Sequence, residues 1–284
     1  MQNIKIGGVP EHFNMPWHYA SGSGLFAQRG INIQWTDYST GTGAMMQDIH
    51  NQKLDLAIVL TEGAVSAISN GINAKILQWY TKSSLNWGIH TGTESHIVSE
   101  EQIYTSKYAV SRLGSGSHLM AHVHAQKNKH VLSEEQFVIV NSLRGAETAL
   151  TDRTADVFFW EKYTTQNSVD KGIFRRIGEI LTPWPCFVVV ANDEFINNNK
   201  SKLFDVLTII NQVNKNFKNI HNVAQSIAQK YNLEISQVIE WLDTVEWAHE
   251  IQVEPEVLEG ISKKMFELQI IKNCKPSSQI IYKF

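Results

Sequence analysis

The chain has 284 residues, enough for one large domain or two of about 140 residues, each with a buried core. Its 43% hydrophobic and 19% charged residues are typical of a globular protein. A net charge of −3, with no cluster of Lys and Arg, gives no reason to expect nucleic-acid binding, and no apolar run is long enough for a transmembrane helix. The two cysteines, Cys186 and Cys274, are not expected to form a disulfide.

The first 80 residues alternate between extended and helical segments. We predict apolar strands at Ile4–Val9, Ile31–Asp37, Leu54–Leu60 and Lys75–Tyr80. Helices are predicted between them at Trp17–Gln28, Ala44–Asn51 and Glu62–Ser69. Short apolar strands separated by helices are typical of βαβ units, so a mostly parallel sheet with helices on both faces is expected.

A second alternating segment follows the first. Its predicted strands are Tyr108–Ser111, Gln136–Val140 and Val157–Trp160, with helices at His118–Lys127 and Gly145–Leu150. Phe187–Ala191 is the last strong strand. Beyond Ser201 the apolar residues fall at helical spacing, and further helices are predicted at Val223–Tyr231, Ser236–Leu242 and Glu254–Leu268. We interpret this tail as a helical cover for one lobe.

Two loops of small residues each open a predicted helix. They are Thr40-Gly41-Thr42-Gly43 and Ser115-Gly116-Ser117, the second leading into His118. Free backbone N–H groups and the helix dipole make such a position favourable for an anion. The alternative is that the hydroxyls only cap their own helices. Two such loops in separate α/β segments favour a ligand held between two lobes.

Polar residues follow two of the predicted strands. Thr61 and Glu62 come after Leu54–Leu60, and Glu161 follows Val157–Trp160. Open α/β sheets bind ligands at the carboxyl ends of their strands. The two glutamates are therefore candidates to accept hydrogen bonds from a ligand amine or amidine. The alternative is a carboxylate that only stabilises a helix N-terminus.

Aromatic residues and histidines supply further candidates. Trp17, Trp160 and Trp184 are placed at strand ends or in loops, where an indole can stack on a planar ligand, although packing alone would also explain them. His118 lies in the first turn of its helix and is a candidate ligand contact. His118 and His122 have a spacing that suits a metal ion. No third ligand is evident, so we interpret this side of the helix as solvated and expect no metal and no cofactor.

The sequence shows no catalytic constellation. There is no G-x-S-x-G elbow, no Walker A motif, no EF-hand loop and no Cys/His metal cluster. We therefore assign no catalytic residue, and the sequence favours a binding protein over an enzyme.

The pattern of the first lobe resembles the type II periplasmic-binding-protein superfamily. The resemblance rests on Gly7–Pro10, Leu25–Ile33, Gly41–Met45 and Leu54–Ala57. The most specific piece is Leu25–Ile33, where a helix ends and the second strand begins. The loop 112–117 and the strand after Asp156 fit as well. The sequence looks closest to the branch of taurine-, nitrate- and sulfonate-binding and thiamine-pyrimidine-precursor-binding proteins.

The resemblance implies an α/β fold of two lobes, each a mostly parallel sheet flanked by helices. Residues 1–90 and 187–284, with the helical tail, would form lobe one, and residues 91–186 would form lobe two. Asn86–Thr91 and Trp184–Val188 would be the strands that cross between the lobes.

The implied function is that of a solute-binding protein. It would capture a small anionic or planar amine-bearing metabolite between two lobes, with an ABC permease and ATPase as partners, and a monomer is favoured. Met1 leads directly into the first strand without a signal-peptide pattern. A periplasmic or extracellular location therefore requires a leader ahead of it, and a native start at Met1 implies the cytoplasm. The alternative is a cytoplasmic enzyme or ligand sensor on the same fold. The cysteine-rich motif of the thiamine-pyrimidine synthase is absent.

Overall fold

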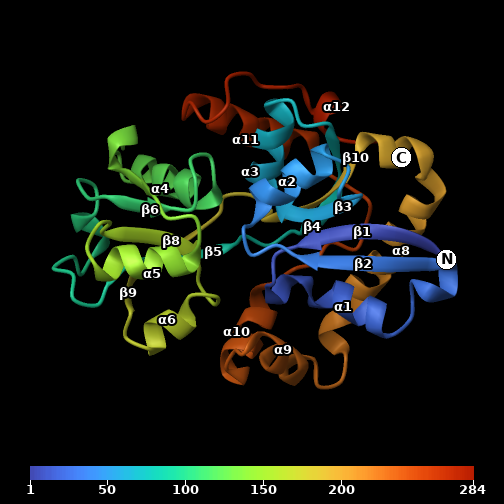
Figure 1. Cartoon of the computed structure of the whole chain (residues 1–284), viewed down its shortest axis with the longest axis horizontal. Coiled ribbons are helices and arrows are strands. Elements are labelled where there is room, and N and C mark those ends of the chain that lie inside the picture. Colours follow the sequence, from blue (N-terminus) through green and yellow to red (C-terminus); the bar gives the residue numbers. More distant parts are fainter. The chain divides into compact units, whose positions relative to one another are not determined.

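The computed structural model describes residues 1–284, which form two compact units. Unit 1 comprises residues 1–84 and 184–284, and unit 2 comprises residues 85–183. The chain thus leaves unit 1, builds unit 2 without interruption and returns. Each unit is built on one five-stranded sheet (Figure 1).

The sheet of unit 1 has the strand order β2-β1-β3-β10-β4. Its strands are β1 (Gln2–Gly8), β2 (Ile31–Asp37), β3 (Leu56–Leu60), β4 (Ala74–Thr81) and β10 (Phe187–Asn192). β1 pairs in parallel with β2 and β3, whereas β10 pairs antiparallel with both β3 and β4. All residues of β10 are buried, as expected for a strand in a sheet covered on both faces.

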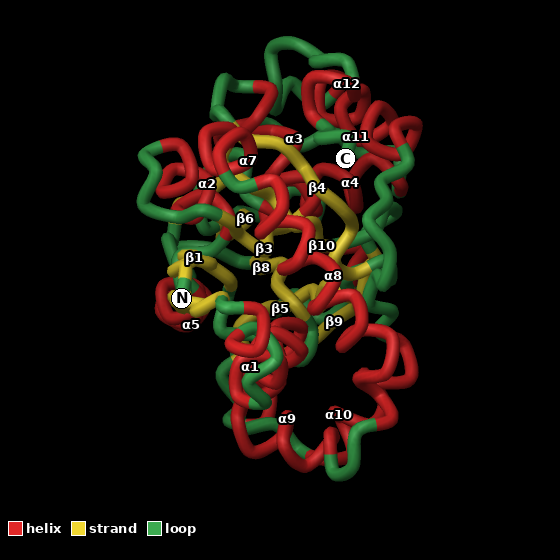
Figure 2. Tube along the Cα trace, turned by 90° about the vertical axis from the view of Figure 1, so that its right-hand side faces the viewer, coloured by secondary structure: helices red, strands yellow, loops and turns green.

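Helices cover both faces of this sheet (Figure 1). One face carries α2 (Thr42–His50), α3 (Thr61–Ser69) and α11 (Pro255–Glu267). The other carries α1 (Met15–Gly22) and α8 (Lys200–Asn216), and on the same side α9 (Val223–Tyr231) packs against α10 (Ile235–Thr244) (Figure 2). Two short helices, α7 (Asp193–Asn198) and α12 (Ser277–Ile280), complete the unit. Leu203, Val206 and Ile210 of α8 are fully buried, because their spacing places them on one face of the helix.

Unit 2 repeats the arrangement, with strand order β7-β6-β8-β5-β9. Its strands are β5 (Asn86–Gly92), β6 (Tyr108–Val110), β7 (Phe137–Ile139), β8 (Val157–Glu161) and β9 (Phe174–Leu181). Here β5 is the antiparallel strand, between β8 and β9. The helices are α4 (Gly116–Lys127), α5 (Leu143–Thr151) and α6 (Gln166–Asp170), and Figure 1 shows α4 and α5 on opposite faces of the sheet.

The predicted α/β fold class is confirmed, with differences in several elements, among them the short helices α6, α7 and α12, which were not predicted. The helix predicted at Trp17–Gln28 ends at Gly22, because Gly24 (φ +71°) and Gly30 (φ +69°) turn the chain through left-handed conformations. Strand β9 was not predicted from the sequence. It lies at the edge of its sheet and carries charged residues among its apolar ones, which hides the alternation of a half-buried strand. No helix combines the length and apolar character needed to span a bilayer.

Gly145 tests the packing of unit 2. A Cβ at this position would overlap the carbonyl oxygen of Val140, so we expect Gly145→Ala to reduce the free energy of unfolding by about 1–3 kcal/mol. Gly260 is the matched control, since it lies in α11 with open space around its Cα, and Gly260→Ala should instead stabilise by about 0.5–1 kcal/mol. Urea unfolding of both variants measures the difference. Equal effects of the two substitutions would contradict this packing.

Candidate functional site

The residues predicted to bind a ligand are divided between the two units. Unit 1 contains Trp17, Thr40, Gly41, Thr42, Gly43, Thr61, Glu62 and Trp184. Unit 2 contains Ser115, Gly116, Ser117, His118, Trp160 and Glu161. Ligand contact by any of them stays a prediction, and each group is described within its own unit.

In unit 1 the first predicted loop brings two helix N-termini together. Gly41 has a φ of +75° and precedes α2, whose first residue is Thr42. The Thr42 hydroxyl accepts a hydrogen bond from the Leu60 N–H at 3.1 Å. A Cβ at Gly63 would overlap the Thr42 methyl group, so the glycine lets the first turns of α2 and α3 touch. Two helix dipoles therefore present their positive ends at one place.

Glu62 lies in the first turn of α3 and is the main buried acid of this region. Its side chain is buried, and the indole Nε1–H of Trp184 donates to its Oε2 at 2.9 Å. The other carboxyl oxygen, Oε1, has no hydrogen-bond partner. Burial raises the pKa of Glu62 to about 7, against the opposing effects of its own backbone N–H and of the Trp184 hydrogen bond. This carboxyl therefore changes charge near neutral pH and keeps one free acceptor.

The Trp184 segment is held by Thr61, the first residue of α3. The Thr61 hydroxyl donates to the Pro185 carbonyl at 2.6 Å, and the Thr61 N–H donates to the Cys186 carbonyl at 3.0 Å. These bonds fix residues 184–186 against the start of α3. Thr61 therefore positions the indole that pairs with Glu62.

Trp17 lies in the hydrophobic core of unit 1. Its ring is fully buried, stacks with Phe26 at a centroid distance of 5.9 Å and contacts Trp35 and Tyr80 at 6.3 Å. From the sequence, Trp17 was placed at the start of a helix and counted among the positions at strand ends or in loops; it lies inside α1, because this helix begins at Met15. Packing accounts for the position of the ring, whereas its buried Nε1–H has no hydrogen-bond partner.

In unit 2 the second predicted loop is a network of caps. Ser115 is the N-cap of α4, and its Oγ accepts from the His118 N–H at 3.4 Å. Ser117 Oγ accepts from the Ser111 N–H at 3.2 Å and lies 3.0 Å from Ser115 Oγ. Both hydroxyls thus serve the loop itself, which is the structural role that the sequence left open beside ligand binding.

The interpretation of the His118 and His122 side of α4 as solvated is wrong. His118 is 4% exposed and His122 is 9% exposed. Phe137 packs against both rings, at centroid distances of 4.3 and 5.0 Å, and excludes water from them. Burial lowers the pKa of His118 to about 4 and also lowers that of His122.

Trp160 and Glu161 end strand β8. Trp160 is partly exposed and stacks on Phe158, with ring centroids 5.2 Å apart. Glu161 is buried, and its Oε2 accepts from both the backbone N–H and the hydroxyl of Thr164 at 2.7 Å. Burial raises the pKa of Glu161, and the hydrogen bonds from Thr164 oppose that shift. This carboxylate is therefore better satisfied than Glu62.

Sequence reasoning missed two polar residues beside Glu161. His90 of β5 is fully buried, with its Nε2 3.0 Å from the Thr165 hydroxyl and 3.4 Å from the Arg176 Nε. Burial and the nearby Arg176 lower the pKa of His90 to about 3. His90 and Arg176 face each other across the β5–β9 register. Because β9 was not predicted, nothing in the sequence indicated that His90 and Arg176 lie opposite each other.

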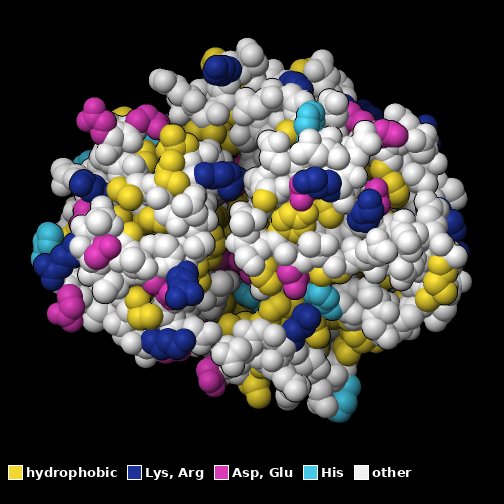
Figure 3. Space-filling model, viewed as in Figure 1, with side chains coloured by type: hydrophobic (Ala, Val, Ile, Leu, Met, Phe, Trp, Pro, Cys, Tyr) yellow, Lys and Arg dark blue, Asp and Glu magenta, His cyan; other side chains and the backbone are white.

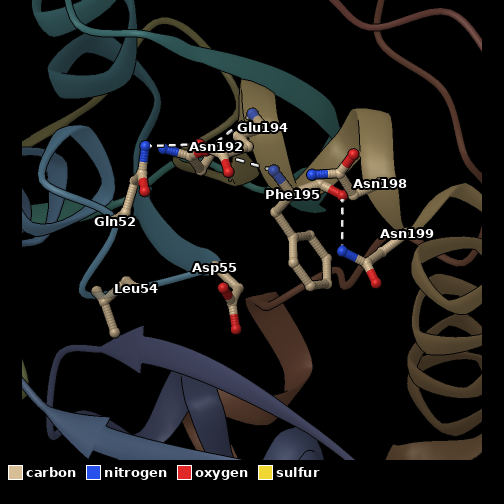
Figure 4. Close-up of a pocket in the computed structure, with 8 residues that line it drawn as sticks. All are labelled: Gln52, Leu54, Asp55, Asn192, Glu194, Phe195, Asn198 and Asn199. Atoms are coloured by element: carbon tan, nitrogen blue, oxygen red, sulfur yellow. Dashed lines mark hydrogen bonds between the residues drawn. The ribbon is translucent and has the colours of Figure 1, made fainter.

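Two cavities lie in unit 1, and neither is lined by a predicted site residue. One, of about 190 Å³, is bordered by the end of the loop before β3 and by β10 and α7 (Figure 4). The side-chain amide of Asn192 lines this cavity and caps α7, because its oxygen accepts hydrogen bonds from the backbone N–H groups of Glu194 and Phe195. The polar groups there therefore already have structural roles. The other, of about 280 Å³, lies beside the C-terminal residues 281–284.

Charged side chains on the face shown in Figure 3 are interspersed, with Lys and Arg beside Asp and Glu. This face carries no broad basic patch of the kind that binds a nucleic-acid backbone.

Replacing Glu62 with Gln tests the charge change near neutral pH. Because the pKa of Glu62 is raised from 4.5 to about 7 on folding, its contribution to stability is complete below pH 4.5 and is lost as the pH rises to 7. Relative to Glu62→Gln, the parent should lose roughly 3 kcal/mol of unfolding free energy across that window. Urea unfolding at several pH values measures this loss.

Trp184→Phe is the matched control, because it keeps the carboxyl and removes the indole N–H that stabilises the carboxylate. In that variant the loss of stability should extend to higher pH. If the unfolding free energies of the parent and of Glu62→Gln changed with pH in the same way, the raised pKa of Glu62 would be contradicted.

Comparison with known proteins supports the same fold. Residues 87–180 match the family model described as Ca3427-like PBP. No curated protein sequence matches the chain. The Candida albicans CA3427 gene product, reported to have the generic periplasmic-binding-protein fold, is similar in structure with a TM-score of 0.91 and 22% identity, over 100% of this chain and 97% of that one.

Two bacterial proteins are also similar in structure. The alkanesulfonate-binding protein SsuA from Xanthomonas axonopodis pv. citri, bound to MOPS, has a TM-score of 0.81 and 13% identity, covering 99% of this chain and 98% of that one. The ligand-binding component of an ABC-type import system from Staphylococcus aureus, with zinc bound, has a TM-score of 0.79 and 12% identity, covering 99% and 97%. The chain therefore has the periplasmic-binding-protein fold that its sequence pattern resembles.

Proposed function

We propose that this chain is a solute-binding protein that captures a small metabolite for an ABC-type importer. The proposal is supported by the fold, which is shared over nearly the full length with an alkanesulfonate-binding protein and with the ligand-binding component of an import system. It is also supported by the sequence, which contains no recognisable catalytic motif.

The observation that carries the proposal is the free oxygen of Glu62. A buried acceptor without a partner is costly, and a ligand N–H placed against Oε1 would remove that cost. The adjoining first turns of α2 and α3 favour a negative group on the same ligand. We therefore propose that the ligand is a planar amine-bearing molecule with a small anionic group.

Native mass spectrometry of freshly purified protein tests the proposal. We expect a small molecule to co-purify with the chain and to be released on denaturation. Incubation with the identified molecule should give saturable binding and leave it unchanged. Appearance of a product would overturn the binding-protein assignment and favour the alternative, an enzyme on the same fold.

Glu62→Gln should weaken binding of that molecule at least tenfold, or about 1.4 kcal/mol, because it replaces a charge-assisted acceptor with a neutral amide. His130→Gln is the control, since His130 is exposed on unit 2, and it should leave the affinity unchanged. Isothermal titration calorimetry at pH 8, where Glu62 is mostly ionised, measures both. Equal affinity of Glu62→Gln and the parent would exclude Glu62 from the site.

Ser117→Ala tests the loop of unit 2. A Leu at this position would disturb the loop itself, because Ser117 is buried and bonded to Ser111. The Ala variant should lower the unfolding free energy by about 1 kcal/mol through the lost hydrogen bond. If the loop also binds the ligand, affinity falls as well. Unchanged affinity with the expected loss of stability would limit the loop to a capping role.

A further inference from the structure

Two histidines and a glutamate of unit 2 bring their ligating atoms together, and only His118 among them is also a predicted contact of the ligand in the proposed function. His118 and His122 lie one turn apart on α4, and their Nε2 atoms are 3.3 Å apart. Glu134 Oε1 lies 3.9 Å from His118 Nε2. All three ligating atoms fall within 4.8 Å of one another.

We propose that His118, His122 and Glu134 form a binding site for a divalent first-row transition metal such as Zn²⁺. Two imidazole nitrogens and a carboxylate are an established donor set for such an ion, and they leave a fourth position for water or an exogenous ligand. Nitrogens bound at 2.0–2.1 Å to a tetrahedral Zn²⁺ lie about 3.3–3.4 Å apart. The two imidazoles already have that separation.

The backbone of Glu134 is held in place, while its carboxylate can move. Glu134 begins a single 3-10 turn, Glu134–Gln136, which is closed by a capping box between Ser133 and Gln136. The Gln136 amide also donates to the carbonyls of Tyr104 and Ser106 at 3.0 Å. The Glu134 side chain is 69% exposed, so rotation can bring its oxygen from 3.9 Å from His118 Nε2, and within 4.8 Å of the His122 nitrogen, to the separation of about 3.3 Å from both nitrogens that coordination requires.

The surroundings favour neutral imidazoles, which is the form that binds metal. Both rings are buried, and Phe137 packs against them.

Metal binding has a structural consequence for the loop before α4. The Gly114 N–H donates to His118 Nδ1 at 3.1 Å, so in the metal-free protein the ring proton of His118 is on Nε2, facing His122. A metal on Nε2 takes the place of that proton, which moves to Nδ1 of the same ring. The Nδ1–H of His118 and the backbone N–H of Gly114 would then face each other, so the Gly114 peptide has to turn away. We therefore expect moderate affinity and a displaced loop.

The test uses the full chain, stripped with EDTA and dialysed. Titration with Zn²⁺ by calorimetry should give one site per chain, and Co²⁺ should give the visible absorption of a tetrahedral complex. His118→Gln, His122→Gln and Glu134→Gln should each weaken Zn²⁺ binding at least tenfold. Glu135→Gln and His96→Gln are matched controls at exposed positions of unit 2 and should bind like the parent. Thermal unfolding without metal establishes that each variant is folded.

Nitrogen NMR of the histidine rings supplies a readout that does not depend on affinity. On addition of Zn²⁺, His118 should change from the Nε2–H to the Nδ1–H tautomer, and the Gly114 amide resonance should shift. The proposal is overturned if the parent binds no Zn²⁺, if the three variants bind as well as the parent, or if Zn²⁺ binds without changing the His118 tautomer.

Discussion

The pairing of β10 with β3 and β4 holds unit 1 together. It joins segments more than a hundred residues apart in sequence, with Val189 opposite Ile58 and Val190 opposite Ala57 in a fully buried part of the sheet. Trp184 and Pro185 lie immediately before β10 in the chain. The hydrogen bonds of Thr61 and Glu62 to that segment directly adjoin the register of β10 with β3. The buried carboxyl with its free oxygen depends on this long-range pairing.

Much of the fold was accessible from the sequence, because its central strands are short apolar runs bounded by turn residues. Ile31–Asp37 was predicted with the bounds that the structure gives. The helices after the two small-residue loops were also predicted, but each begins two residues earlier than expected, at Thr42 and Gly116. The apolar face of α8 was readable from its spacing. These features depend on residues close together in the sequence. Such local patterns indicate directly the spacing of the apolar residues and where a helix or strand begins and ends. Strand β9 shows the limit, since its charged residues mask the period.

The candidate sites were less accessible, because they depend on contacts that periodicity does not encode. Glu62 was selected as a strand-end residue, but nothing in the sequence indicated that Trp184 would donate to it. The third group beside His118 and His122 is Glu134, which the chain brings back from the turn that precedes β7. The prediction that this side of α4 is solvated was wrong for the same reason, because Phe137, which covers it, belongs to the strand that follows in the chain, β7. The environments of Glu62 and of the two histidines are therefore set by tertiary contacts.

The order in which the strands are synthesised has a consequence for how this chain folds on the ribosome. Strand β4 has β10 as its sole sheet neighbour, and β10 follows the whole of unit 2 in the chain. The first 84 residues therefore emerge with an unpaired edge, whereas residues 85–183 contain every strand of their own sheet. Pairings between distant segments form slowly because the loop between them must first close. The inserted unit is thus placed to fold early, and its folding draws the two ends of that loop together.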